Sequence, residues 1–391
     1  MVAIAKGAAQ VVPMEGDPGT EEGYSSVYRR WVYSQGVPIT DGIAVPDLYA
    51  LETKPWADTG VNMNFAVLDT TGDLTDFWVM DIPPGGQLKP FRHMFHAIYH
   101  VLTGRGATSV WINENKKHTF EWQRGSLFCI PLNANYEMFN GSGSEPARLV
   151  ACTTAPLSMR LHPYNDFIFG SDAVFPTLFT GDEDDYFSGE NQAKNKRAGA
   201  WQSNFVADVR NMEVFTVANR GQGSIRTFSV KGSFLEAHTT DWDPGTYRKP
   251  HRHGPGAHVL LLTGVGYSLN WADGKDKYKV YWKDGTVYCP PNYFWHQHFN
   301  PGPEQARFLA FKMGGGHLVG RTSFPYAHSR YWPSDVPNNL ANQGDQIDYD
   351  EEDPWIKDDF VEECKKWGGV PQLERMTMDY EKKLAGGSNH M

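Results

Sequence analysis

The sequence predicts an all-β chain built from two copies of one barrel-like domain, and three observations support this. Aromatic residues make up 14% of the 391 residues, and 39 glycines and 25 prolines accompany them. Such a mixture is typical of strands joined by turns. Short apolar or alternating runs also end in turn residues, as in the segment GTVYCPPNY. Finally, the chain matches itself without a gap when it is shifted by a constant number of residues.

The internal repeat aligns residues that lie 160 positions apart, because Lys89-Pro90 recurs as Lys249-Pro250 (249 − 89 = 160). A run of ungapped identities indicates a duplicated domain of about 100 residues. The further identities at this offset are Pro84-Gly85 with Pro244-Gly245, Arg92-His93 with Arg252-His253, Leu102-Thr103-Gly104 with Leu262-Thr263-Gly264, Trp111 with Trp271, Trp122 with Trp282, Cys129 with Cys289, and Phe139-Asn140 with Phe299-Asn300.

The repeat divides the chain into five expected parts: an arm of mixed character, a first barrel, a polar linker or excursion, a second barrel and a C-terminal extension. They are expected over residues 1–60, 61–160, 161–222, 223–320 and 321–391, respectively. Within the barrels, the polar segments NENKKH and ADGKDK are predicted hairpin tips. Many short strands at regular spacing are typical of a sandwich or barrel.

The C-terminal extension is predicted to be helical. Asp353 as N-cap, Pro354 in the first turn and Gly368 after the last turn predict a helix over the segment WIKDDFVEECKKW. The segment VPQLERMTMDYEKKL is expected to form a second helix.

Charge and composition argue against two classes of partner, and a small-molecule substrate is expected. A net charge of −10 argues against nucleic acid or an anionic membrane as a partner. No apolar run reaches the roughly 18 residues of a membrane helix, and the N-terminus is too weakly apolar for a secretory signal. The four cysteines lack CxxC spacing and are expected to be reduced thiols in a cytoplasmic protein. The arm and the extra barrel offer surface for a homo-oligomer.

Three histidines of the second copy are the predicted metal ligands. His251 and His253 share one face of a strand, because alternate residues of a strand point the same way. His296, in the segment PPNYFWHQHFN, is the candidate third ligand. Two further residues are expected on the same strand faces as these histidines, because His298 is two residues from His296 and Tyr247 is four residues from His251. His298 is a candidate for acid/base work or substrate contact, with a packing role as the alternative. Tyr247 is a candidate substrate contact, with a core role as the alternative.

The first copy lacks two of these three ligands. Phe91 stands where the second copy has His251, and Tyr136 stands where it has His296, although His93 is kept. The joint loss is what a dismantled metal site would look like, so the metal is expected in the second barrel alone. His96 and His100 share a face and could form a different ligand set, but filler or surface roles are favoured.

These residues resemble the two motifs of the cupin superfamily, G(X)5HXH(X)3,4E(X)6G and G(X)5PXG(X)2H(X)3N. Gly245 followed by His251 and His253 fits the first motif. The second motif is matched by Gly285, Pro291, His296 and Asn300, with Tyr293 where the family has glycine. The resemblance covers about half of the chain and implies a bicupin, with two double-stranded β-helix (jelly-roll) barrels and a helical C-terminal tail.

The chain departs from the first motif at its glutamate. Counting back from Gly264 places Ala257 in that position, whereas counting on from His253 places His258 there. The alignment of Ala97 with Ala257 favours the first count. His258 would then point out of the barrel, and the centre would contain three histidines without a carboxylate. If His258 turns inward, the centre would contain four histidines.

The pattern resembles the gentisate 1,2-dioxygenase-like group of bicupins, although that group usually carries its intact site in the N-terminal barrel. The resemblance implies Fe(II), with Mn, Ni, Cu, Co or Zn as possible alternatives. It further implies a small oxygen-chelating substrate, such as a hydroxylated aromatic acid or a diketone, whose C–C bond is cleaved with O₂. Two alternatives stay open: a non-redox isomerase, lyase or decarboxylase that uses the ion as a Lewis acid, and a non-catalytic bicupin that binds a metal or ligand.

Overall fold

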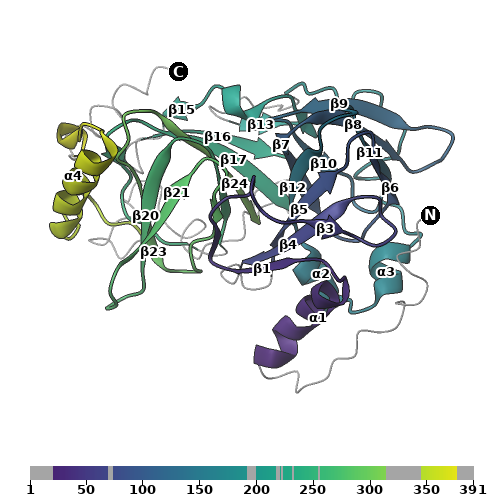
Figure 1. The fold of residues 1–391 in the computed structure, drawn as a ribbon, viewed down its shortest axis with the longest axis horizontal. Helices are drawn as coiled ribbons and strands as arrows, with labels where there is room; N and C mark the ends of the chain where they lie inside the picture. Colours follow the sequence, from purple (N-terminus) through teal and green to yellow (C-terminus); the bar gives the residue numbers. More distant parts are fainter. Residues whose placement is uncertain are drawn as a thin grey trace.

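The computed structural model describes residues 21–68, 74–191, 200–216, 221, 223–230, 233–253, 256–313 and 345–376. Two β-rich halves lie side by side, with the first in purple and blue and the second in green (Figure 1). Within the described residues, each half pairs a large sheet of eight strands with a small sheet of four. The chain is therefore all-β with two jelly-roll barrels, as the repeat predicts.

The first barrel follows the jelly-roll order, in which neighbours in a sheet come from distant parts of the sequence. Its small sheet contains β6 (Gln87–Phe91), β11 (Asn135–Asn140), β8 (Arg105–Trp111) and β9 (His118–Gln123). Its large sheet contains β1 (Ile39–Gly42), β4 (Asn62–Leu68), β5 (Asp76–Ile82), β12 (Ala147–Thr153), β7 (Ala97–Thr103), β10 (Leu127–Ile130) and β14 (Phe205–Val206), with β3 (Lys54–Pro55) beside β4.

The second barrel repeats this order strand for strand. Its small sheet contains β18 (Thr246–Tyr247), β23 (Trp295–Asn300), β20 (Val265–Trp271) and β21 (Tyr278–Lys283). Its large sheet contains β13 (Ala200–Gln202), β16 (Ser224–Ser229), β17 (Leu235–Trp242), β24 (Ala306–Met313), β19 (His258–Thr263), β22 (Val287–Tyr288) and β2 (Ala44–Val45), with β15 (Phe215–Thr216) beside β16.

Two short strands are exchanged between the barrels. β2 precedes the first barrel in sequence, yet its Ala44 pairs with Tyr288 of the second barrel. β14 follows the first barrel's last strand across a long connection, and its Phe205 pairs with Phe128 of the first barrel. The segments around residues 39–45 and 200–206 therefore extend the repeat on the N-terminal side of each barrel.

The two large sheets face each other across a shared apolar core. This core joins side chains of both barrels, among them Phe77 and Val150 of the first and Leu260 and Phe311 of the second. The side chains that alternate with these point into the barrels, because successive residues of a strand face opposite sides. Thus Trp78 and Met80 belong to the interior of the first barrel, and Trp242 and Phe308 to that of the second.

Helices cover the outer parts of the barrels (Figure 1). The longer ones are α1 (Glu21–Ser34) on the first barrel and α4 (Trp355–Trp367) on the second. α4 confirms the helix expected in the extension, because the Asp353 side chain accepts a hydrogen bond from the N–H of Trp355 and Gly368 ends the helix with φ 80°. The shorter helices are α2 (Ala155–Leu161), α3 (Asn165–Gly170) and two 3₁₀ turns at Val209–Asn211 and Leu373–Arg375.

The second helix expected in the extension lies mostly outside the described residues, and only the turn at Leu373–Arg375 falls within them. Among the helices that are described, none is both long enough and apolar enough to cross a membrane.

Candidate metal centre

A bulge in the strand that carries the first motif brings His251 opposite His296. Tyr247 pairs with Phe299, whereas the next paired residues are His251 and His296. The first strand thus uses four residues where the second uses three, and the extra residue reverses the alternation of side chains. The N–H of His251 donates to the carbonyl oxygen of His296 at 3.0 Å, and the N–H of His296 donates back at 2.8 Å.

The bulge also corrects the prediction for Tyr247. Because the alternation is reversed between Tyr247 and His251, the tyrosine faces outward instead of sharing the face of the histidines. Its ring packs against Phe299 and Phe360 at centroid distances of 4.9 and 5.0 Å, and its hydroxyl donates to Glu352. Tyr247 is therefore a core residue between the barrel and α4.

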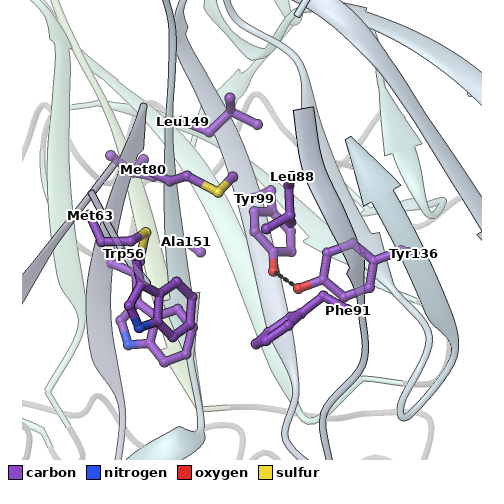
Figure 2. A pocket seen from close by; sticks show the side chains of 11 residues that line it. Trp56, Met63, Met80, Leu88, Phe91, Tyr99, Tyr136, Leu149 and Ala151 are labelled. Carbon is purple, nitrogen blue, oxygen red and sulfur yellow. Dashed lines mark hydrogen bonds between the residues drawn. The ribbon is translucent and has the colours of Figure 1, made fainter. Parts of the chain in front are cut away.

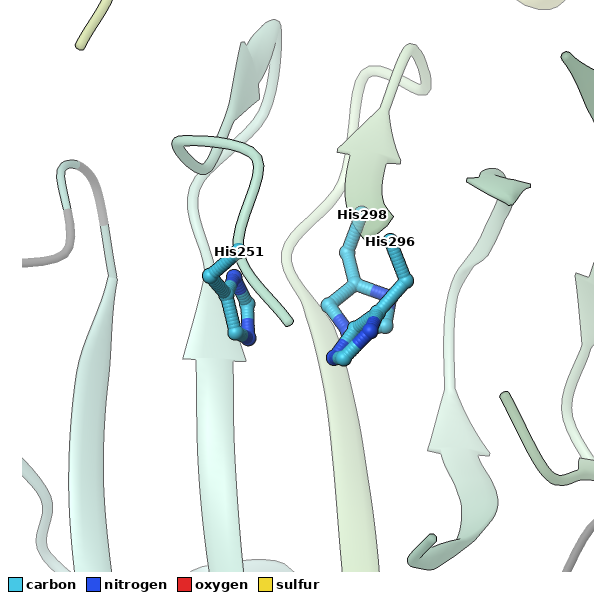
Figure 3. A group of neighbouring side chains, drawn as sticks. All are labelled: His251, His296 and His298. Atoms are coloured by element: carbon cyan, nitrogen blue, oxygen red, sulfur yellow. The ribbon is translucent and has the colours of Figure 1, made fainter. Parts of the chain in front are cut away.

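The three predicted ligands lie together, and His298 joins them. The ring centroids of His251 and His296 are 4.4 Å apart, and His253 lies 5.6 Å from the first ring and 4.8 Å from the second. A ligand nitrogen from each of His251, His296 and His298 lies within 4.8 Å of the others. Figure 3 shows His296 and His298 side by side, with His251 beside them on the neighbouring strand.

Backbone carbonyls fix the tautomer of two of these histidines. Nδ1 of His251 lies 3.0 Å from the carbonyl oxygen of Lys249, and Nδ1 of His296 lies 3.0 Å from that of Phe294. A carbonyl oxygen can only accept, so both rings carry their hydrogen on Nδ1. Each ring therefore turns a bare Nε2 lone pair toward the cluster, as a metal ligand requires.

His298 is held differently, by hydroxyl groups. Its Nδ1 lies 2.6 Å from the Tyr288 hydroxyl and 2.9 Å from that of Ser268, and these two hydroxyls are 2.7 Å apart. Trp282 Nε1 donates to Ser268 at 3.1 Å. Each hydrogen finds an acceptor when Trp282 donates to Ser268, Ser268 to Tyr288 and Tyr288 to Nδ1. His298 then carries its hydrogen on Nε2 and offers a donor to the cluster.

Burial keeps His298 neutral. Desolvation, together with the nearby rings and the positive charge of Arg248, holds the pKa of His298 well below its usual value. Arg248 is itself buried, and its backbone N–H donates to the carbonyl oxygen of His298 at 3.1 Å. The positive charge of Arg248 thus acts on His298 from nearby.

Polar atoms inside the second barrel lack partners among the described residues. They are the side-chain oxygens of Thr240 and Asn270 and the indole nitrogen of Trp242, all buried. Asn270 pairs with His296 across the small sheet, and Trp242 stacks on His298 at 4.9 Å. Buried polar atoms are nearly always satisfied, so this interior suits water or a polar small molecule.

Ala257 and His258 take opposite sides of the barrel wall. Ala257 packs in the interior cluster with Val259 and Tyr288. His258 lies between the two barrels, where it stacks on Phe77 at 5.5 Å and its Nδ1 is 3.9 Å from the Cys152 sulfur. Burial lowers the pKa of His258 to about 3, so it is neutral there. The four-histidine centre that includes His258 is thus not formed.

The first barrel has the same bulge, but phenylalanine and tyrosine side chains stand where the second barrel has its paired histidines. Phe91 pairs with Tyr136, where the second barrel pairs His251 with His296. The Tyr136 hydroxyl lies 3.2 Å from Nε2 of His93 and 2.8 Å from the Tyr99 hydroxyl. Figure 2 shows the two hydroxyls above Phe91, across the pocket from Trp56 and Met63.

His96 and His100 do not replace the lost ligands. In β7, the side chains of Tyr99 and Val101, on either side of His100, point into the first barrel. Ile98 and Leu102 lie on the same face of the strand as His100, and they belong to the core between the barrels. The ring of His96 packs against Phe234 of the second barrel at 5.5 Å. Both histidines therefore leave the first barrel's interior.

Several polar residues of the site were missed from the sequence, although the repeat contained the signal. Each is polar where the residue 160 positions earlier is apolar. The pairs are His238 with Trp78, Thr240 with Met80, Arg248 with Leu88 and Asn270 with Val110. The apolar members line the interior or pocket of the first barrel. The contrast therefore marks a polar interior in the second barrel beyond its three histidines.

Of the comparisons with known proteins, the search of solved structures alone found similar chains. No family model and no curated protein matches the sequence. Among solved structures, a deletion mutant of Bacillus subtilis oxalate decarboxylase has a TM-score of 0.44 and 12% identity, covering 69% of this chain and 76% of that chain. Two point mutants of the same enzyme each have a TM-score of 0.45, with 12% and 13% identity, covering 70% of this chain and 78% of theirs.

The architecture itself defines the fold. Two jelly-roll barrels repeat one strand order, and the histidines of two separated motifs meet inside the second. The chain therefore has the bicupin fold that the motifs imply.

Proposed function

We propose that the second barrel is the active site of a metal-dependent enzyme that removes a carboxylate from a small, oxygen-chelating acid. The observation that carries this proposal is the difference in hydrogen-bond partners among the clustered histidines, which are carbonyl oxygens for His251 and His296 and hydroxyls for His298. His251 and His296 offer bare nitrogens that suit a metal, while His298 offers an N–H beside them. A ligand set and a proton donor in one pocket are what a non-redox decarboxylation needs.

The donor set suits a first-row transition metal held by His251, His253 and His296. Imidazole suits Fe, Ni, Cu and Zn, whereas hard ions such as Mg²⁺ and Ca²⁺ prefer oxygen. When bound, the ion would supply Lewis-acid polarisation of a chelated substrate oxygen. Because Ala257 stands where the cupin motif has its glutamate, the three neutral ligands would leave the full charge of the ion to attract an anion.

The remaining pocket residues would bind the acid and supply the proton. The charge of Arg248, close to His298, would attract the carboxylate, and the unpartnered oxygens of Thr240 and Asn270 would accept hydrogen bonds from substrate hydroxyls. In the reaction, the C–C bond to the carboxylate breaks, CO₂ leaves, and the electron pair stays with the retained carbon. That carbon then takes the hydrogen of Nε2 of His298 while Nδ1 takes the hydrogen of the Tyr288 hydroxyl, so that the imidazole stays neutral and the hydroxyl regains a proton from solvent.

A second candidate is the Fe(II)-dependent dioxygenase implied by the sequence resemblance. The observation that favours it is the absence of a carboxylate in the histidine cluster, since Ala257 faces the interior where the cupin motif has glutamate. Within the described residues the cluster contains only histidines. This candidate requires O₂ as a co-substrate, whereas the decarboxylase does not.

The two candidates are separated by the gas that the reaction consumes or releases. Protein purified without oxygen would be analysed for metal and incubated with short keto and dicarboxylic acids, hydroxylated aromatic acids and diketones. We expect CO₂ release under nitrogen, and its loss in His251→Ala. Turnover that depends on stoichiometric O₂ uptake would instead support the dioxygenase. Bound metal without turnover of any acid would support a binding protein.

A further inference from the structure

We infer that residues 345–352, here called the strap, hold His251 in the orientation that lets it bind a metal, with Asp348 as the main positioning residue. This inference rests on the proposed metal site and goes beyond it, because it assigns a role to the C-terminal extension. The strap packs along the first-motif strand on the side away from His296.

Backbone hydrogen bonds tie the strap to the residues on both sides of His251. The N–H of Arg252 donates to the carbonyl oxygen of Asp345 at 3.0 Å, and the N–H of Ile347 donates to that of Pro250 at 2.9 Å. His251 forms one bridge with Gln346 and another with His296. It is therefore a central residue of a three-stranded arrangement, and both of its neighbours restrict its backbone.

A buried ion pair then fixes the residue whose carbonyl orients the His251 ring. Lys249 Nζ lies 2.6 Å from Asp348 Oδ1, and the two side chains are only 5% and 8% exposed. The carbonyl oxygen of the same Lys249 accepts the hydrogen of His251 Nδ1. Holding Lys249 in place therefore holds the hydrogen on Nδ1 and directs the bare Nε2 into the pocket.

Two further contacts anchor the strap to the site. The Tyr349 hydroxyl donates to the carbonyl oxygen of Tyr247 at 2.7 Å. Gln297, which lies between His296 and His298 in β23, donates to Glu352 at 3.1 Å. The strap thus contacts the strands of both motifs, so it can keep the two halves of the ligand set in register.

The first barrel provides an internal comparison. Its Arg92 pairs with Asp172 as Arg252 pairs with Asp345, so an arginine–aspartate contact is common to both barrels. Lys89, the counterpart of Lys249, is instead exposed and makes no ion pair within the residues that the structure describes. Of the two equivalent lysines, only Lys249 forms a buried pair with an aspartate among the residues that the structure describes.

The test measures His251 directly and Co²⁺ binding separately. Apoprotein labelled with ¹⁵N-histidine reports the tautomer of each ring by long-range ¹H–¹⁵N correlation, and His251→Phe assigns the His251 signal. Co²⁺ titration gives the affinity, and its visible spectrum reports the coordination. Asp348→Asn is the test variant. Asp359→Asn is the matched control. Asp359 of α4 makes an ion pair of the same length with Lys279, which lies in β21, a strand without candidate ligands.

In Asp348→Asn we expect the His251 signal to broaden or shift toward mixed tautomers, and Co²⁺ to bind at least tenfold more weakly with an altered spectrum. Asp359→Asn should keep both readouts within twofold of wild type. If Asp348→Asn does not fold, Lys249→Met combined with Asp348→Leu removes both charges and should give the same losses. A wild-type His251 signal and affinity in whichever variant folds would overturn the inference.

Failure of the proposed function would look different. If wild-type protein bound no Co²⁺ while Asp348→Asn still disturbed the His251 tautomer, the metal site would be wrong and the positioning role of the strap would stand.

Discussion

The hydrogen-bond partner of Nδ1 determines whether Nε2 of a histidine in the second barrel's cluster carries a hydrogen. The carbonyl oxygens of Lys249 and Phe294 leave Nε2 of His251 and His296 without hydrogen. Nδ1 of His298 instead faces the hydroxyls of Tyr288 and Ser268, and its Nε2 carries the hydrogen when Tyr288 is the donor. Residue identity alone would make all these histidines equivalent, whereas their hydrogen-bond partners differ.

Replacing His298 tests this division of roles. In His298→Ala we expect kcat to fall by about 100-fold, in the range of a lost general acid, while Co²⁺ affinity stays within about threefold. His298→Gln, whose amide can still donate, should keep more activity than the alanine variant. A loss of Co²⁺ affinity as large as that in His251→Ala would contradict the donor role and make His298 a ligand.

At this scale the sequence indicated the candidate ligands better than their surroundings. His251, His253 and His296 could be proposed as ligands because both motifs keep their spacing and the first copy has lost two of them, and the structure brings their rings together. The tautomer of His298 could not be predicted, because it depends on Tyr288 and Ser268, which come from other strands. The strap has no apolar pattern, so its contact with Lys249 could not be predicted either.

Among the elements, the bulged first-motif strand has the largest effect on the site. Its extra residue turns His251 inward and Tyr247 outward. Alternation predicts a continuous strand from Tyr247 to His253, and one inserted residue suffices to make this wrong. The exchanged strands β2 and β14 were also missed, because two residues are too short to show a periodic pattern.

Two equivalent glycines allow the small sheets to close. A Cβ on Gly266 would clash with the Phe299 carbonyl oxygen and the Trp282 ring, and one on Gly106 would clash in the same way in the first barrel. We expect Gly266→Ala and Gly106→Ala each to cost about 1–3 kcal/mol in the free energy of unfolding, measured with denaturant. Only Gly266→Ala should also lower activity, because Trp282 donates to Ser268 in the His298 network.

The outcome that would contradict this account of the small sheets is equal loss of activity in both alanine variants. It would mean that the catalytic pocket depends on general packing rather than on the second barrel's own network.

The buried carboxyl of Asp76, beneath helix α1, makes the first barrel sensitive to pH. Tyr28 of α1 donates a hydrogen bond to Asp76, and Trp31 stacks on Trp78 at 5.8 Å. Burial raises the pKa of Asp76 to about 7, against the opposing effect of the Tyr28 hydrogen bond. The folded protein therefore holds a proton that the unfolded chain releases near pH 4.

The sign of the effect follows from this difference. A carboxyl with a raised pKa stabilises the fold fully below about pH 4, and this contribution is lost as pH rises toward 7. We expect the free energy of unfolding to fall over this window, by at most about 4 kcal/mol for the Asp76 contribution. Denaturant curves of Asp76→Asn should lack that part of the slope, and an unchanged slope would show that Asp76 does not titrate on unfolding.

In the whole molecule, one domain was duplicated and the two copies then diverged in their interiors. An arginine–aspartate pair was kept at the equivalent place in both copies. Arg148 pairs with Asp81 in the first barrel, and Arg307 pairs with Asp241 in the second. Each arginine also donates to backbone carbonyls of an exchanged segment, at Leu48 and at Arg210, respectively. These equivalent contacts lock the exchanged strands, so the barrels support each other.

The divergence of the interiors accounts for the histidine cluster that the described residues form in the second barrel and not in the first. The first barrel replaces polar interior residues with tryptophan, methionine and leucine, and its remaining His93 bonds to Tyr136. Its contribution is a packed surface for the second barrel, through the core that both large sheets share. Association of whole chains into a homo-oligomer stays a prediction.

The most direct test of the account is the number and place of bound metal ions per chain. Metal-free protein would be titrated with Co²⁺ and compared with two variants that copy the first barrel, His251→Phe and His296→Tyr. We expect one Co²⁺ per chain in wild type and, in either variant, affinity at least 100-fold weaker, with the fold intact by circular dichroism. Two ions per chain, or full binding by the variants, would contradict a single centre in the second barrel.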